Sequence, residues 1–324
     1  MEEKKLLVDV IIPAYKPGKR FKRLLRMLTV QTFTVHQVII INTEKKYWDQ
    51  DGMDGAMPEG LPVMVRHISK EEFDHGATRH MAMKLCEGDI AICMTDDAVP
   101  ADKYLIENLT RAFSQAGPGG EAVIQAYARQ LPDKKCGFIE RYTRSFNYPD
   151  DSRIKTKKDL KALGIKTYFA SDVCCAYRRD LYFSQGGFIR RTIFNEDMIF
   201  AGKAIQSGYA VAYMSDAKVI HSHNYTCIEQ FRRNFDLAVS QADHPEVFAG
   251  IRSESEGIRL VKTTALYLLK KGRFWLIPDL ILKSASKYLG YRMGKNYDRL
   301  PRAVVLWCTM SPGYWKNTAD WRKL

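Results

Sequence analysis

The sequence lacks the features of a membrane-spanning or secreted, disulfide-rich protein. No run of 18 apolar residues occurs among its 324, which argues against a membrane-spanning helix. Residues 2–5 are all charged and lead directly into a predicted strand, so no secretory signal is expected. The seven cysteines show no paired metal-binding spacing, which favours buried thiols in a reducing cytoplasm.

Two nucleotide-binding signatures are also missing. Neither Gly-x-Gly-x-x-Gly nor Gly-x-x-x-x-Gly-Lys-Ser/Thr occurs, which disfavours Rossmann dinucleotide binding and P-loop chemistry. The chain lacks an RNP-type aromatic signature, so no nucleic-acid partner is expected despite a net charge of +13. This charge instead suits an anionic membrane surface or a polyphosphate substrate. With 46% hydrophobic residues, the chain can bury one sizeable core and an accessory region.

The most informative segment is residues 87–98, where a short apolar run ends on two adjacent carboxylates. Residues 90–94 are typical of a buried parallel strand, and Asp96 and Asp97 follow its carboxyl end. Ligands in open α/β sheets bind beyond such strand ends, where carboxylate oxygens can hold Mg²⁺ or Mn²⁺ against a diphosphate. The alternative for an Asp-Asp pair is ordinary turn and helix-cap chemistry.

A β-α-β unit is predicted at the start of the chain. Residues 6–12, apolar apart from Asp9, are typical of a central strand, and Pro13-Ala14-Tyr15 is expected to form an irregular exit whose backbone groups contact a ligand. An amphipathic helix should follow, and residues 38–42 predict a second buried strand that ends on Asn42. The apolar face of the helix is predicted to carry Phe21, Leu24, Leu25 and Leu28.

A phosphate site is predicted at the start of a helix that runs through Leu85. Gly76 permits a tight turn after Phe73, and Thr78 and Arg79 fall in the first helical turn. Free backbone N–H groups, the helix dipole and a guanidinium together suit a phosphate. A plain helix start with a solvated arginine is the alternative.

Acidic and histidine residues gather in the last third of the expected sheet region. Asn195-Glu196-Asp197 opens a helical pattern, where carboxylates are commonly only caps. His221 and His223 lie two residues apart after residues 217–220, which are apolar apart from Lys218, so on an extended segment both side chains face one way. One of the two histidines is expected to complete a metal site begun by Asp97.

Taken together, these segments resemble the GT-A glycosyltransferases, and more narrowly their large inverting family 2. The similarity covers roughly residues 8–225 and rests on Val10-Ile-Ile-Pro-Ala-Tyr15, Thr95-Asp-Asp-Ala98 and Asn195-Glu-Asp197 in that order. One departure is Asn42, since the family commonly has a carboxylate after the second strand. An amide can still hydrogen-bond the base or the ribose of a nucleotide.

Narrower local similarity is to bacterial rhamnosyltransferases that use dTDP-L-rhamnose. It lies in residues 73–79, 171–178, 186–188 and 219–225. The resemblance implies a nucleotide-sugar donor, with dTDP-β-L-rhamnose favoured, and a lipid-linked saccharide acceptor in cell-surface polysaccharide synthesis.

The resemblance also implies an α/β fold of the GT-A type, a Rossmann-like and mostly parallel sheet flanked by helices. Residues 1–225 would be the catalytic domain, with a donor half of about 1–98 and an acceptor half of about 99–225. Residues 226–324 would form a helical, basic and aromatic accessory region. Within the acceptor half, the polar residues 149–164 are expected to be a loop, with a mobile flap over the site as one option.

Site roles follow from the same resemblance. Asp97 with a histidine would hold Mg²⁺ or Mn²⁺ to neutralise the diphosphate leaving group. Asp197 would be the general base on the acceptor hydroxyl, and Asp172 and Glu196 would hold the acceptor or donor sugar. The expected donor-binding residues are Pro13, Ala14, Tyr15, Asn42, Phe73, Gly76, Arg79, Asp96 and Arg233.

The tail combines cations with apolar and aromatic residues. Gln230 and Arg233 lie one turn apart on a predicted helix and either face the diphosphate or form a solvated basic face. Residues 258–291 alternate apolar clusters with Lys and Arg, which favours peripheral binding to the anionic inner face of the cell membrane from the cytoplasm. Packed accessory helices or a homo-oligomer interface are the alternatives. The aromatic residues considered for this surface are Trp275, Tyr288, Tyr291, Trp307 and Trp315.

Three rival functions remain at this point. The first keeps the fold and changes the donor to a UDP-hexose. The second is a nucleotidyltransferase, which would normally show a Gly-rich basic loop where Pro13-Ala14-Tyr15 stands. The third is a non-enzymatic basic module that binds membrane or nucleic acid, which would not need carboxylates at strand ends.

Overall fold

The computed structural model describes residues 6–251 and 254–316, which fall into two compact units. The first unit consists of the chain up to Asp133 together with Tyr148–Arg191 and Glu196–Ser222. The second consists of Lys134–Asn147, Thr192–Asn195 and the chain from His223 onward.

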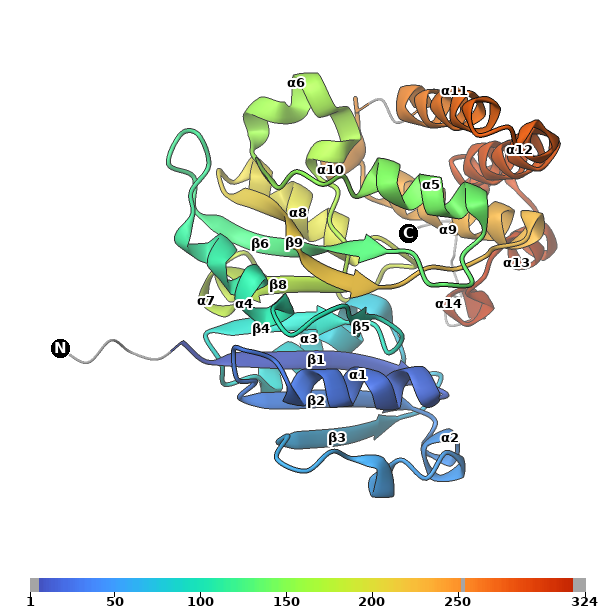
Figure 1. The fold of residues 1–324 in the computed structure, drawn as a ribbon. Coiled ribbons are helices and arrows are strands. Elements are labelled where there is room, and N and C mark those ends of the chain that lie inside the picture. The colour runs from blue at the N-terminus through green and yellow to red at the C-terminus, as the bar shows by residue number, and fades with distance from the viewer. Residues whose placement is uncertain (1–5, 252–253, 317–324) are drawn as a thin grey trace. The chain divides into compact units, whose positions relative to one another are not determined.

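A nine-stranded mixed sheet forms the centre of the first unit, in the order β3-β2-β1-β4-β8-β6-β9-β5, with β7 paired to β9 (Figure 1). Strands β3, β2, β1 and β4 run parallel, as the predicted β-α-β opening requires. Around β8 the pairing becomes antiparallel, with both β4 and β6. The predicted α/β class is therefore confirmed, and the sheet is parallel only in part. The strands are β1 (Val8–Tyr15), β2 (Gln37–Thr43), β3 (Val63–Ile68), β4 (Ile90–Met94), β5 (Val99–Pro100), β6 (Val123–Leu131), β7 (Arg153–Lys155), β8 (Cys174–Arg178) and β9 (Ala210–Ile220).

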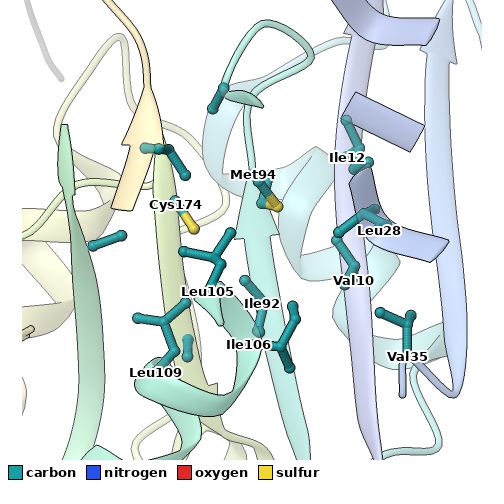
Figure 2. Packing of buried hydrophobic residues seen from close by; sticks show 14 of the residues in the cluster. Val10, Ile12, Leu28, Val35, Ile92, Met94, Leu105, Ile106, Leu109 and Cys174 are labelled. Atoms are coloured by element: carbon teal, nitrogen blue, oxygen red, sulfur yellow. The ribbon is translucent and has the colours of Figure 1, made fainter. Parts of the chain in front are cut away.

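Helices cover the sheet and bury its apolar side chains. Helix α1 begins at Lys19 and buries the four residues predicted for its apolar face. Because side chains alternate along a strand, Val10 and Ile12 point to the same face of β1 and pack with Ile92 and Met94 of β4 (Figure 2). Full burial of each such side chain contributes about 1.5–3 kcal/mol. The helices of this unit are α1 (Lys19–Thr29), α2 (Lys45–Gln50), α3 (His75–Leu85), α4 (Leu105–Thr110), α6 (Leu160–Leu163), α7 (Arg179–Ser184) and α8 (Glu196–Gln206).

The loop predicted for residues 149–164 is wrong in part. Strand β7 pairs antiparallel with β9, from Arg153 opposite Tyr213 to Lys155 opposite Val211. A short 3₁₀ helix, η3 (Lys157–Asp159), and α6 follow. Three residues are too few to show a strand period in the sequence, and the partner strand β9 supplies the hydrogen bonds that fix them.

The second unit is helical. Helix α9 begins with a capping box, in which the Thr226 hydroxyl accepts from the Glu229 N–H and the Glu229 carboxylate accepts from the Thr226 N–H. Phe231, Phe235 and Trp315 pack in its core. The helices are α5 (Phe138–Asn147), α9 (Cys227–Asp243), α10 (Pro245–Phe248), α11 (Glu254–Lys270), α12 (Ile277–Gly294), α13 (Arg302–Cys308) and α14 (Pro312–Lys316), with the 3₁₀ helix η5 (Phe274–Leu276) before α12.

Two glycines let α12 pack directly on the backbone of α9. A Cβ atom at Gly290 would lie 2.1 Å from the Phe231 carbonyl oxygen, and one at Gly294 would lie 2.3 Å from that of Phe235. Real Cβ atoms do not approach so closely, so any side chain at either position would push the helices apart.

Two expectations from composition are met in the described residues. None of the helices there is long and apolar enough to cross a membrane. All seven cysteines lie in the described part and carry free thiols, and all except Cys227 are buried.

Candidate active site

The exits of β1 and β4 are joined by a hydrogen bond. The Tyr15 N–H donates to Asp96 Oδ2 at 3.0 Å. Burial raises the pKa of Asp96 to about 6, against the lowering effect of this bond. The predicted irregular exit at Pro13 is wrong, because β1 continues through Tyr15 in register with β2. Pro13 is tolerated there because the pairing of β1 with β4 has already ended at Ile11, so no partner on that side needs its missing N–H.

Backbone strain occurs at the sequence-predicted segments. Among the described non-glycine residues, positive φ angles occur at Lys16 (54°), Glu44 (66°) and Asn195 (66°). Lys16 follows β1, Glu44 follows β2, and Asn195 precedes α8. Such conformations cost about 1–3 kcal/mol each and cluster at functional sites, so Lys16 and Glu44 support a site at the ends of β1 and β2.

Asn42 and two tyrosines lie at the ends of β1 and β2. Asn42 is fully buried and bonds His67 through Nδ2 at 3.0 Å, while its Oδ1 has no hydrogen-bond partner. Tyr15 is half-exposed and meets Tyr47 edge to face, with ring centroids 5.5 Å apart. The Lys16 ammonium lies 4.7 Å from the Tyr47 ring centroid. This arrangement offers an unpaired acceptor, aromatic surface and positive charge, which suit a nucleotide.

The predicted metal ligands come together after β4 and β9. Ligand atoms of Asp97, His221 and His223 all lie within 4.8 Å of one another. His221 Nε2 is 3.5 Å from Asp97 Oδ1. The same carboxylate oxygen accepts a hydrogen bond from the Thr95 hydroxyl at 2.9 Å. The histidines follow β9 rather than continuing it, since the strand ends at Ile220.

Gln130 fixes the ring of His221. Gln130 Nε2 donates to the Ser171 hydroxyl at 2.9 Å, which leaves Gln130 Oε1 to accept from His221 Nδ1 at 3.0 Å. With the proton on Nδ1, the lone pair of His221 Nε2 points toward Asp97. An imidazole held in this way is the usual form of a metal-binding histidine, and imidazole nitrogens and carboxylate oxygens are both ligands of divalent metal ions. The chemistry of these residues therefore fits a divalent cation.

The first turn of α3, where a phosphate site is predicted, carries a cap from within its own segment. The Asp74 carboxylate accepts from the Ala77 N–H at 2.8 Å, and the Asp74 N–H donates to the Thr78 hydroxyl at 3.2 Å. Gly76 has a packing role instead, because a Cβ there would lie 2.0 Å from the Ile189 carbonyl oxygen. The Asp74 carboxylate thus satisfies one of the N–H groups at the start of the helix, and the phosphate role of this segment stays a prediction.

Arg79 is buried between two carboxylates. It is 5% exposed, with Nε 3.2 Å from Asp172 and Nη1 2.9 Å from Glu196. The Tyr177 hydroxyl donates to Asp172 Oδ1 at 2.6 Å. The guanidinium is thus engaged by Asp172 and Glu196, and its position orients both.

Asp197 completes this acidic cluster. Its two oxygens accept from the Asp172 N–H at 2.9 Å and the Met198 N–H at 2.7 Å. Burial first, and the charge of Glu196 second, raise the pKa of Asp197 to about 7 despite these bonds and Arg79. Asp172 and Glu196 are buried, whereas Asp197 keeps part of its surface exposed. A positioned, partly exposed carboxyl group with such a pKa suits a general base.

Known proteins resemble this chain over most of the segments described above. A model of glycosyl transferase family 2 matches residues 9–183. The chain belongs to glycosyl transferase family 2. It is 37% identical to the O-antigen chain rhamnosyltransferase RfbN of Salmonella typhimurium, over 96% of both chains. It is 36% identical to the O-antigen chain rhamnosyltransferase WbaN of Salmonella anatum, over 95% of both chains.

Solved structures support the fold of this glycosyltransferase. A mannosyltransferase from Pyrobaculum calidifontis, solved with GDP-Man and Mn²⁺, has a TM-score of 0.56 and 14% identity, over 97% of this chain and 88% of that one. Residues 1–349 of S. aureus TarS, solved with UDP-GlcNAc, have a TM-score of 0.50 and 15% identity, over 91% and 92% of the two chains. The predicted family 2 membership and GT-A fold are confirmed.

Two residues of the candidate site, Arg20 and Gln130, were not predicted from the sequence. Arg20 of α1 reaches the Asp133 carboxylate and lies 4.0 Å from Asp97 Oδ2. It was indistinguishable from the other cations on the polar face of its helix. Gln130 carried a weak signal, because a buried side-chain amide in a strand such as β6 requires a partner.

Arg233 belongs to the second unit. Its guanidinium stacks 4.6 Å from the Phe194 ring centroid and 5.6 Å from that of Tyr225. The role of Arg233 at the diphosphate stays a prediction.

Proposed function

We propose that this glycosyltransferase transfers L-rhamnose from dTDP-β-L-rhamnose, with inversion, to a lipid-linked saccharide in cell-surface polysaccharide synthesis. The observation that carries the proposal is similarity along almost the whole chain to two O-antigen chain rhamnosyltransferases. The acidic cluster around Asp197 supports it, because inversion by a single displacement needs one base and no nucleophile on the protein.

The donor is proposed to bind at the ends of β1 and β2. Asn42 Oδ1, which is buried without a partner, is proposed to accept a hydrogen bond from the base or the ribose. Tyr15 and Lys16 contribute aromatic surface and positive charge. Phe73 is retained as a further donor contact by the family resemblance.

Asp97, His221 and His223 are proposed to hold Mg²⁺ or Mn²⁺. A bound divalent ion would supply positive charge to the diphosphate leaving group. Thr95 orients Asp97, and Gln130 keeps the proton of His221 on Nδ1, so that both side chains present lone pairs. Arg20 adds a cation beside Asp97.

Asp197 is proposed to take the proton of the acceptor hydroxyl as that oxygen attacks the anomeric carbon. Its raised pKa makes the carboxylate a stronger base than an exposed aspartate. Asp172 and Glu196 are proposed to hold the reacting sugars, and Arg79 to hold these two carboxylates in place rather than to contact phosphate. The catalytic domain is proposed to be residues 1–225, with the donor half at about 1–98.

The experiment is a transfer and donor-hydrolysis assay across dTDP-rhamnose, UDP-glucose, UDP-galactose and GDP-mannose, with and without Mn²⁺. We expect dTDP-rhamnose to be used best and the reaction to require the ion. The variant that tests the metal role is Asp97→Asn, which should remain folded and lose most turnover. A clear preference for a UDP-sugar would contradict the rhamnose assignment and leave the family unchanged. Full activity of Asp97→Asn in excess chelator would contradict the metal role.

We also propose that the second unit docks on the anionic inner face of the cell membrane from the cytoplasm. The α11–α12 surface supports this: it combines large exposed apolar side chains with the cations Lys270, Lys271 and Arg273. Each cation near an anionic surface contributes about 1 kcal/mol, to which apolar insertion adds. Trp315 does not belong to this surface, because it is 2% exposed and packs in the core. The apolar members are Leu266, Leu269, Phe274, Trp275, Ile281, Leu282, Tyr288 and Leu289.

A further inference from the structure

Lys155, the last residue of β7, is a buried cation that the proposed function does not use. It is 3% exposed. Its ammonium donates to the carbonyl oxygen of Lys166 at 3.1 Å and to that of Phe169, and it lies 4.8 Å from the centroid of the Tyr127 ring. Burying a lysine is costly unless its hydrogen bonds are satisfied, and here two carbonyls and an aromatic face satisfy it.

The surroundings of Lys155 are mainly apolar and aromatic. Tyr127 packs against Phe169 with centroids 5.6 Å apart and against Tyr213 at 5.2 Å. Burial lowers the pKa of Lys155 to about 7, with Cys175 and Asp159 opposing that shift and Arg153 and Lys166 adding to it. The ammonium and the neutral amine both carry N–H donors, so the two carbonyl contacts survive loss of the proton.

The segment that Lys155 holds leads directly into the candidate active site. Phe169 is followed by Ala170, Ser171 and Asp172. The Ser171 hydroxyl accepts from Gln130, whose other end fixes His221, and the Asp172 N–H donates to Asp197. The last carbonyl bound by Lys155 is therefore two residues before Ser171 and three before Asp172.

We propose that Lys155 is a positioning residue for the transfer reaction. By tethering the carbonyls of Lys166 and Phe169, it sets where the chain delivers Ser171 to Gln130 and the Asp172 N–H to Asp197. The link to catalysis rests on the proposed function, whereas the tether itself rests on the contacts of Lys155 alone.

Stability alone does not account for a lysine at this position. An apolar side chain of similar length would pack against Tyr127 and Phe169 without the desolvation penalty, and replacing buried charges with hydrophobic residues is often neutral or stabilising. What the apolar side chain lacks is the pair of directed hydrogen bonds. Small displacements of reacting groups reduce rates by up to about a hundredfold, so directed bonds matter more for the reaction than for folding.

The test is Lys155→Met in the full-length protein, with Lys157→Met as the matched control, since Lys157 is exposed two residues along the chain. Amide hydrogen exchange should accelerate by about tenfold or more in peptides covering residues 166–173, and only there. In the transfer assay kcat should fall about tenfold to a hundredfold, while KM for the donor stays within about threefold. Lys157→Met should change neither measurement.

Lys155→Gln keeps two N–H donors on a shorter side chain and should give intermediate exchange and kcat. If Lys155→Met does not fold, the Gln variant alone decides: wild-type exchange together with wild-type kcat overturns the proposal. Loosened exchange with an unchanged kcat also overturns the positioning role. If the wild-type protein transfers no rhamnose but Lys155→Met still loosens residues 166–173, the proposed function fails and the tether stands.

Discussion

Replacing Asp197 with asparagine should remove the base and also change how the stability of the protein depends on pH. The pKa of Asp197 rises from 3.8 to about 7, chiefly through burial and secondly through Glu196. Between these two values the folded protein holds a proton on Asp197 that the unfolded chain has released. The free energy of unfolding therefore falls as pH rises from about 4 to about 7. At about 1.4 kcal/mol per pH unit, the full penalty above pH 7 is at most about 4 kcal/mol, because Asp197 keeps some contact with solvent.

Asparagine is neutral at every pH and escapes this penalty. It has only one acceptor oxygen for the N–H groups of Asp172 and Met198, so the variant loses a hydrogen bond at a cost of about 1–3 kcal/mol. The difference in unfolding free energy between Asp197→Asn and wild type should thus grow by about 2–3 kcal/mol from pH 5 to pH 8. At pH 8 the variant should be the more stable protein. Its turnover should fall by about 10² to 10⁴ while donor binding stays close to normal.

The assay is urea unfolding of both proteins at each pH unit from 5 to 8, paired with transfer rates. Asp151→Asn, at an exposed carboxylate, is the control, and its stability difference should not vary in this way. A difference between Asp197→Asn and wild type that is flat with pH would show that Asp197 is already ionised at pH 5, and the argument from burial would be wrong. Loss of donor affinity with an intact rate of bound substrate would instead make Asp197 a binding group.

Three further outcomes are expected. Gln130→Met should weaken Mn²⁺ binding by about 10-fold to 100-fold, because the proton of His221 is then no longer held on Nδ1. The binding is measured by calorimetry without donor, and equal affinity of variant and wild type would refute this role of Gln130. Gly290→Ala and Gly294→Ala should each destabilise the second unit by about 1–3 kcal/mol in thermal unfolding, whereas Gly257→Ala on α11, where a Cβ meets open space, should not. The protein should co-sediment with anionic liposomes, and added salt should release it from them. The double variant Lys270→Glu, Lys271→Glu should bind the liposomes more weakly. Equal recovery of the protein in the supernatant with neutral and anionic vesicles at low salt would favour an accessory domain or an oligomer interface.

Features that depend on a local stretch of chain could be predicted from the sequence. The apolar run of β4 and the carboxylates that follow it are close together in the sequence. The end of the strand and the position of Asp97 could therefore be predicted together. The same holds for α1 and its buried face, and for Glu196 and Asp197 at the start of α8.

Features that depend on contacts between residues far apart in the sequence could not be predicted in this way. Gln130 acts through His221, 91 residues away, and through Ser171, 41 residues away. Gly290 matters only because the backbone of α9 lies against it. At the start of α3 the N–H groups were counted as free, whereas the Ala77 N–H is capped by Asp74, three residues before it. Burial, which decides the pKa of Asp197 and the engagement of Arg79, is a property of the whole fold.

The choice of base among three neighbouring carboxyl groups follows from burial and charge. One cation, Arg79, faces Asp172, Glu196 and Asp197, so full ionisation would leave two uncompensated negative charges in the cluster. Burial raises the pKa of Asp172 well above its ordinary value, while Arg79 and the hydrogen bond from Tyr177 oppose that rise. Asp172 and Glu196 are buried, whereas Asp197 is partly exposed and its pKa is raised to about 7, so Asp197 combines access to an acceptor hydroxyl with the ability to gain and lose a proton. The same residue type is thus proposed to serve as an anchor at position 172 and as a base at position 197, because the two environments differ in burial.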